Sequence, residues 1–153
     1  MNMMHKQSGI TLIEIMTVIA VAAVLASIAI PSVVGWLPKY RMVNAGDELL
    51  STLQACRIRA VRENADVVIA LDFANDSYTA FVDTSGNGLR EAGERSVKSA
   101  QMPPGIDLQD GTLGNTVTFN RRGFPAAGGT VVVNNGSQTR TINLTLAGTS
   151  SIL

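Results

Sequence analysis

Apolar and polar positions divide the chain into three successive patterns, and the first is an apolar run near the N-terminus. Residues 10–30 form this run of 21 residues, with Glu14 as its one charged side chain. As a helix the run would be about 30 Å long, which matches the hydrocarbon core of a bilayer. We therefore expect a transmembrane helix over residues 10–30. A cleaved secretory signal is the alternative, but its apolar core is usually only about 7–15 residues long and fits a carboxylate poorly.

The second pattern, in residues 31–65, is helical. Apolar side chains recur there at spacings of three or four and form one stripe, made of Met42, Ala45, Leu49, Leu53, Cys56 and Ala60. This spacing predicts a helix whose stripe packs on a globular domain. Pro31 and Pro38 each lack an amide hydrogen, so we expect kinks in this extension of the helix. Asn64 is suited to end it, and Cys56 is expected to be a buried core residue rather than a reactive thiol.

The third pattern, from residue 66 onward, alternates with period two and predicts strands. These strands cover residues 66–73, 78–83, 116–120, 130–134 and 140–146, and the sequence NNGS at 134–137 predicts a hairpin turn. The predicted fold class is therefore α+β. A long N-terminal helix packs against a small, mostly antiparallel β-domain over residues 66–153.

Composition narrows the classes of function. The chain has 12 basic and 12 acidic residues, one cysteine and one histidine, His5. A single cysteine excludes an intrachain disulfide, and this composition disfavours a zinc site or a Cys–His nucleophile. No glycine-rich phosphate loop precedes a helix. We expect neither an enzyme nor a cofactor.

Around the first apolar run, the stretch QSGITLIEIMTV at residues 7–18 resembles the N-terminus of type IV pilins and pseudopilins. Gly9 precedes the run, Glu14 is the fifth residue after it, and Pro31 stands where pilin helices commonly have a proline. The resemblance implies a prepilin leader over residues 1–9, cut by a prepilin peptidase between Gly9 and Ile10. It also implies N-methylation at Ile10, although the family more often has Phe at this place.

The resemblance also implies a role for Glu14 in assembly. Cleavage creates a free amine at Ile10, and Glu14 of one subunit can pair with the Ile10 amine of a neighbour, because a buried carboxylate needs a partner. Such a pair would set the axial register of the subunits. The alternative is a carboxylate that is tolerated near the membrane surface, only five residues into the span.

The order of motifs in the remaining chain resembles the GspH/FimT family of minor pseudopilins. These motifs are LQACRIRAVRENADVVIAL, DTSGNGLREAGE and VTFNRRGFP. The resemblance implies a minor subunit of a type II secretion pseudopilus or a type IV pilus. It would be anchored once in the inner membrane, with its C-terminal domain in the periplasm. Its partners would be other pilin or pseudopilin subunits, the prepilin peptidase and inner-membrane lipid.

An acidic glycine-containing segment, residues 83–94, invites comparison with an EF-hand calcium loop. Asp83, Ser85, Asn87 and Glu94 fall at places 1, 3, 5 and 12 of such a loop. The segment follows a predicted strand rather than a helix and lacks a full set of carboxylates. This context favours a polar hairpin tip over a Ca²⁺ site.

Basic residues near the C-terminus raise a second function, DNA binding by a competence pilus. Arg121, Arg122 and Arg140 are the only charged residues in 111–153, and some type IV pilus members of the family bind DNA through basic residues near the C-terminus. Three arginines are a thin footprint for phosphate contacts, and this chain lacks an arginine-rich ending. DNA uptake is therefore the alternative function, and a solvated surface is the favoured interpretation of these arginines.

Overall fold

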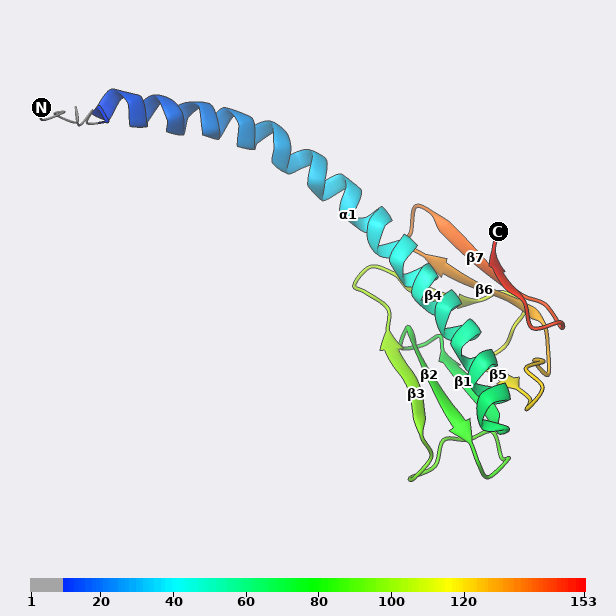
Figure 1. Ribbon diagram of the computed structural model, residues 1–153. Coiled ribbons are helices and arrows are strands. Elements are labelled where there is room, and N and C mark those ends of the chain that lie inside the picture. The colour runs from blue at the N-terminus through cyan, green and yellow to red at the C-terminus, as the bar shows by residue number, and fades with distance from the viewer. Residues whose placement is uncertain (1–9) are drawn as a thin grey trace, which may run out of the picture. The chain divides into compact units, whose positions relative to one another are not determined.

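The computed structural model describes the backbone of residues 10–153 and the side chains of residues 10–28 and 36–153. The predicted leader, with Gly9, lies outside the described residues. The described chain contains the helix α1 (Leu12–Glu63) followed by eight strands (Figure 1). It separates into two compact units, one ending at Leu37 and one formed by Pro38–Leu153. We call the second the globular unit.

Both described ends of α1 carry recognisable caps. At the start, the amide of Glu14 donates to Thr11 Oγ1 at 3.3 Å, so Thr11 is the N-cap and Glu14 is the third helical residue. At the end, Asn64 has a φ of 48°, and the amide of Ala65 donates to the Ala60 carbonyl at 3.3 Å. A residue in the left-handed conformation, followed by an amide that bonds to the carbonyl five residues earlier, forms a Schellman C-cap. The predicted stop at Asn64 is confirmed.

The helix runs through the positions of both prolines without a break. Pro31 and Pro38 lie inside α1, and the side chain of Pro31 lies outside the described residues. Among the helices of the described residues, none combines the length and the apolarity needed to cross a membrane.

The first sheet has the strand order β3-β2-β1-β5, with all neighbours antiparallel. Its strands are β1 (Asp66–Asp72), β2 (Ser77–Asp83), β3 (Ser96–Gln101) and β5 (Thr116–Phe119). Strand β1 is central, since β2 pairs along its whole length on one side and β5 pairs on the other. Strand β3 is therefore an edge strand whose described neighbour in the sheet is β2 alone.

The second sheet has the order β4-β6-β7-β8 and is also antiparallel. Its strands are β4 (Asp107–Asp110), β6 (Gly129–Asn134), β7 (Thr139–Leu144) and β8 (Ser150–Ile152). The turn between β6 and β7 uses Gly136 at a φ of 80°, and the Gly136 amide donates to Asn134 Oδ1. The predicted hairpin at 134–137 is thus confirmed, as is the predicted α+β fold with its antiparallel β-structure.

The core lies where the second half of α1 covers both sheets (Figure 1). All six residues of the predicted stripe are buried and belong to this core. Facing them are Val67, Ile69 and Leu71 of the first sheet and Val131, Val133, Ile142 and Leu144 of the second. Burial raises the pKa of the Cys56 thiol to about 12, which agrees with the prediction that Cys56 is a core residue.

Three strands were not predicted, and three predicted strands end earlier than expected, at Asp72, Phe119 and Leu144. Strands β3, β4 and β8 are short or mostly polar, with the sequences SVKSAQ, DLQD and SSI. The strand predicted over residues 66–73 ends at Asp72, because Asp72 accepts the amides of Ala74 and Asn75 and starts the turn. Phe73 therefore lies in that turn and is only partly buried.

Candidate assembly and binding surfaces

The first described turns of α1 present apolar side chains without protein cover. Ile10, Leu12 and Ile28 are 73%, 79% and 71% exposed, and most large apolar side chains between them are also exposed. Such a large apolar surface marks contact with a partner or a membrane. This surface lies on residues that the sequence predicts to be membrane-embedded.

Glu14 lies on this surface beside Ile10. Together with Ile15, Val18 and Ile19 the two residues line one shallow hollow of about 330 Å³. As the third helical residue, Glu14 also lies where the N-terminal end of the helix dipole favours negative charge. Its carboxylate makes no ion pair with any residue that the structure describes. The arrangement can therefore accept a cation at the start of α1.

The acidic segment 83–94 forms a loop whose carboxylates bond to its own backbone. Asp83 is buried and accepts the amides of Gly86 and Gly88 at 2.6 and 2.8 Å. Burial raises the pKa of Asp83, but these hydrogen bonds and that from Ser85 outweigh it, so the pKa lies below its usual value. Gly86 and Gly88 have φ values of 75° and 73°, which a residue with a side chain rarely adopts.

Glu94 closes the same loop from its other end. Its Oε1 accepts the amide of Thr84 at 2.9 Å, and its Oε2 accepts the amide of Glu91 at 3.1 Å. These bonds hold the pKa of Glu94 below its usual value, and the bond from the Glu91 amide has the largest effect. The side chain of Asn87 donates to Glu91 and accepts the amide of Leu89, so its bonds are also made within the loop. Within residues 10–153, no group of three or more acidic, histidine or cysteine side chains could hold a metal ion.

The three arginines considered for DNA are not brought together. Arg140 donates to the carbonyl of Val43 and to Asp47, at 2.7 and 2.8 Å, in the first turns of α1 within the globular unit. Arg121 lies 3.8 Å from Asp66, just beyond the other end of α1. Val43 and the end of α1 are separated by about 30 Å of helix. Arg122 is exposed in the loop after β5.

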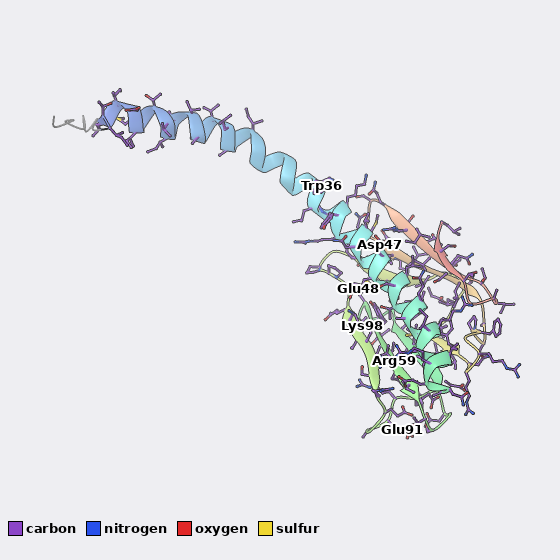
Figure 2. The ribbon with its side chains drawn as sticks, in the orientation of Figure 1. Trp36, Asp47, Glu48, Arg59, Glu91 and Lys98 are labelled. Carbon is purple, nitrogen blue, oxygen red and sulfur yellow. The ribbon has the colours of Figure 1, made fainter. Side chains whose placement is uncertain are left out.

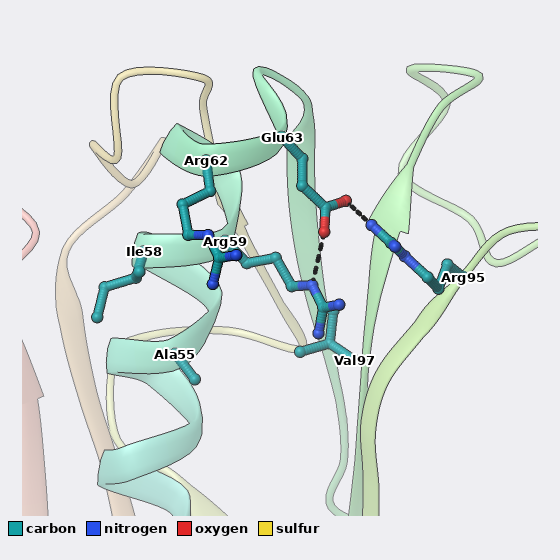
Figure 3. Close-up of a pocket in the computed structure, with 7 residues that line it drawn as sticks. All are labelled: Ala55, Ile58, Arg59, Arg62, Glu63, Arg95 and Val97. Atoms are coloured by element: carbon teal, nitrogen blue, oxygen red, sulfur yellow. Dashed lines mark hydrogen bonds and ion pairs between the residues drawn. The ribbon is translucent and has the colours of Figure 1, made fainter.

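A surface that the sequence did not predict lies between α1 and β3. A hollow of about 410 Å³ is lined there by Ala55, Ile58, Arg59, Arg62, Glu63, Arg95 and Val97 (Figure 3). Glu63 accepts from Arg59 at 2.8 Å and also pairs with Arg95. The bond from Arg59 is the main cause that holds the pKa of Glu63 below its usual value.

The sequence could have predicted the part of this surface that lies on α1. Arg59 and Arg62 are three residues apart and must share a helix face. Arg95 could not be added from sequence, because its position depends on β3, whose polar sequence gives no strand signal.

Comparison with known families gives two matches that together span most of the chain. The sequence model of type II transport protein GspH matches residues 45–149. The model of the prokaryotic N-terminal methylation motif matches residues 4–30. A curated fimbrial protein of Pseudomonas aeruginosa is 28% identical over 129 residues, which cover 84% of this chain and 79% of that protein.

Solved structures of the same fold come from two bacteria. The crystal structure of the type IV minor pilin FimU of Pseudomonas aeruginosa has a TM-score of 0.63 at 18% identity, covering 75% of this chain and 90% of that one. A crystal structure of the minor pseudopilin EpsH from the type II secretion system of Vibrio cholerae has a TM-score of 0.60 at 12% identity, covering 76% and 97%. At these identities the likeness concerns the fold.

Proposed function

The chain belongs to the GspH family of type II transport proteins, and from that premise we propose that it is a minor pilin or pseudopilin. It would be a structural subunit of a type II secretion pseudopilus or of a type IV pilus. The observation that carries this proposal is the start of α1, where exposed apolar side chains surround the carboxylate of Glu14, which has no ion-pair partner within residues 10–153. Its relatives include a fimbrial protein, and proteins of the same fold include a minor pilin and a minor pseudopilin.

The proposal includes processing at the N-terminus. A prepilin peptidase would cut between Gly9 and Ile10, after which Ile10 would be N-methylated. The match to the N-terminal methylation motif over residues 4–30 supports this step. The new amine of Ile10 would then pair with Glu14 of a neighbouring subunit, at the hollow that lies beside Glu14.

The proposal also includes a membrane anchor and a set of partners. Residues 10–30 would hold the unassembled subunit once in the inner membrane, with the globular unit in the periplasm; the apolar run in the sequence supports this. Assembly would exchange lipid contacts of this segment for contacts with the helices of other subunits, with Pro31 inside the buried region. Glu14 would fix the register, because a misaligned subunit leaves its charge unpaired in an apolar bundle.

The test is incorporation into the filament. In the native host, Glu14→Gln should leave the chain processed and folded but should remove it from the sheared filament fraction, measured by immunoblot. Thr17→Ser, a change on the same exposed surface that keeps charge constant, is the matched control and should leave incorporation intact. Equal incorporation of the Glu14→Gln chain would rule out the proposed role of the carboxylate.

Processing is tested separately by mass spectrometry of the mature chain. We expect an N-terminus at Ile10 carrying one methyl group, and we expect Gly9→Val to retain all nine leader residues. A mature chain that starts at any other residue, in cells with active peptidase, would contradict the assigned cleavage site.

A further inference from the structure

The hollow beside Arg59 continues along α1 into a second one, and the two make a single groove. The second hollow, of about 250 Å³, shares Ala55, Arg59 and Val97 with the first and is otherwise lined by Ser51, Thr52 and Lys98. We call the combined surface the α1–β3 groove. Its α1 wall runs from Ser51 to Arg62, which is about 16 Å at 1.5 Å per residue. An extended segment of about five residues has this length.

The groove carries more positive than negative charge. Arg59, Arg62, Arg95 and Lys98 line it, against the carboxylates of Glu63 and of Glu48, which pairs with Lys98 at 2.7 Å (Figure 2). Glu63 draws Arg59 and Arg95 toward one point from opposite walls (Figure 3). The two guanidinium groups are therefore held in place before any partner binds.

Most of the hydrogen-bond donors in the groove are unused. Arg59 bonds to Glu63 through its Nε, which leaves its terminal nitrogens without a described partner. Arg62 makes no ion pair or side-chain hydrogen bond with any residue in the described part of the chain. A guanidinium offers five N–H donors in a plane that matches a carboxylate. The arginines of the groove can therefore donate hydrogen bonds to additional carboxylates.

Between the charges, the groove has an apolar floor. Ala55 and Val97 supply it, and Ile58 lies at its outer edge, on the side of α1 away from Val97, where it is 59% exposed (Figure 3). A single exposed apolar side chain is common on protein surfaces, so the floor supports the site only together with the fixed cations beside it. The floor would favour a ligand that also brings small apolar side chains.

We propose that the α1–β3 groove binds an extended acidic segment of another protein, in which carboxylates alternate with small apolar side chains. The carboxylates would bond to Arg59, Arg62 and Arg95, and the apolar side chains would cover Ile58 and Val97. This goes beyond the proposed function, because it names a recognition site on the globular unit that includes none of residues 10–30.

Protein is the favoured partner over nucleic acid for two reasons on the groove itself. Glu48 and Glu63 lie along it and would repel a continuous row of phosphates. The other exposed arginines, which are Arg41, Arg90, Arg121 and Arg122, line neither hollow and do not extend the groove into a longer basic track.

The experiment uses the full-length chain in a non-ionic detergent and two fluorescein-labelled peptides, GEAEVEG and GQAQVQG. Fluorescence anisotropy at about 50 mM salt should show that the acidic peptide binds at least about tenfold more tightly than its glutamine counterpart. The double variant Arg62→Gln/Arg95→Gln should weaken binding of the acidic peptide by at least about tenfold. Circular dichroism of the variant should match the parent chain, since Glu63 keeps Arg59 as a partner.

The matched control removes the same number of charges elsewhere. Arg90→Gln/Arg122→Gln changes two exposed arginines outside the groove and should change the affinity by less than about twofold. Equal weakening by both double variants, or equal binding of both peptides, would overturn the proposal. So would a twelve-residue oligothymidine that displaces the acidic peptide and binds more tightly than it does, since that would assign the groove to nucleic acid.

Discussion

Two charged residues of the globular unit, Asp83 and Arg140, form hydrogen bonds to backbone atoms. Asp83 gathers amides of the loop that follows it, and Arg140 reaches from β7 to a carbonyl of α1. Asp83 accepts loop amides that no strand or helix bonds, and Arg140 donates to a helix carbonyl that can accept a second hydrogen bond. Such residues stabilise the fold, so their charge is not evidence of a ligand site.

Asp83→Asn should therefore loosen the loop and change how stability depends on pH. The folded-state pKa of Asp83 is lowered, so its contribution is present above the unfolded pKa of about 3.9 and is lost as pH falls below it. We expect the variant to lose about 1–3 kcal/mol at neutral pH and much less at pH 3. Thermal unfolding followed by circular dichroism at both pH values measures this. A loss that is the same at both would contradict the prediction.

Arg140 explains a glycine in the middle of α1. A side chain at Gly46 would lie 3.0 Å from Arg140 Cδ, so the arginine stem packs directly over the helix backbone. Arg140→Met keeps the stem but removes the bonds to Val43 and Asp47, and we expect it to cost about 1–2 kcal/mol.

The control for Arg140 is Arg122→Met, which removes an exposed guanidinium without a described partner and should change stability by less than about 0.5 kcal/mol. Urea unfolding of both variants provides the comparison. If Arg122→Met lowered the stability as much as Arg140→Met, the loss could not be assigned to the bonds that Arg140 of β7 makes with α1.

At the level of elements, α1 has one face that belongs to the core and one that does not. Leu53 is 2% exposed and Ile58 is 59% exposed, although both are large apolar residues on neighbouring turns of α1. We expect Leu53→Ala to cost about 2–5 kcal/mol through the cavity it leaves and Ile58→Ala to cost less than about 0.5 kcal/mol. Urea midpoints of the two variants measure the difference. Similar losses would mean that Ile58 is covered within the folded chain.

The sequence predicted the helix stripe and the strands that alternate, because both depend on local periodicity. It did not predict β3 or β8, since the sequences SVKSAQ and SSI gain their strand conformation from pairing with β2 and β7. It also missed the burial of Val68 and Phe81, which are partners across β1 and β2 on the face away from α1. Alternation alone would have placed Val68 in solvent.

The candidate site was predictable to a similar extent. Glu14 was identified because a carboxylate inside an apolar run is conspicuous in any sequence. The α1–β3 groove was not, because it joins Arg59 to Arg95, 36 positions later in the chain, through a strand that has no local signal. Likewise, the bond from Arg140 to Val43 spans 97 positions, and no pattern in the sequence indicates it.

For the whole molecule, the described core lies in one unit. The core residues fall between Met42 and Leu144, all within Pro38–Leu153. A chain that starts at Pro38 should therefore unfold cooperatively, whereas one that starts at Asp47 loses Met42, Ala45 and the Val43 carbonyl and should melt several degrees lower, about 4–8 °C for each kcal/mol lost. Differential scanning calorimetry of both chains decides this. Equal melting temperatures would show that the first turns of α1 in this unit do not contribute.

The apolar stripe of α1 that both sheets cover also has a consequence during synthesis. The stripe is complete when residue 60 has been made, but its last cover, β7, ends at Leu144. At about 5–20 residues per second the ribosome needs roughly 4–17 s to make the intervening chain. During those seconds the stripe must be shielded by a chaperone or by the export channel, so a cell that lacks such shielding should accumulate aggregated chain even when the sequence is unaltered.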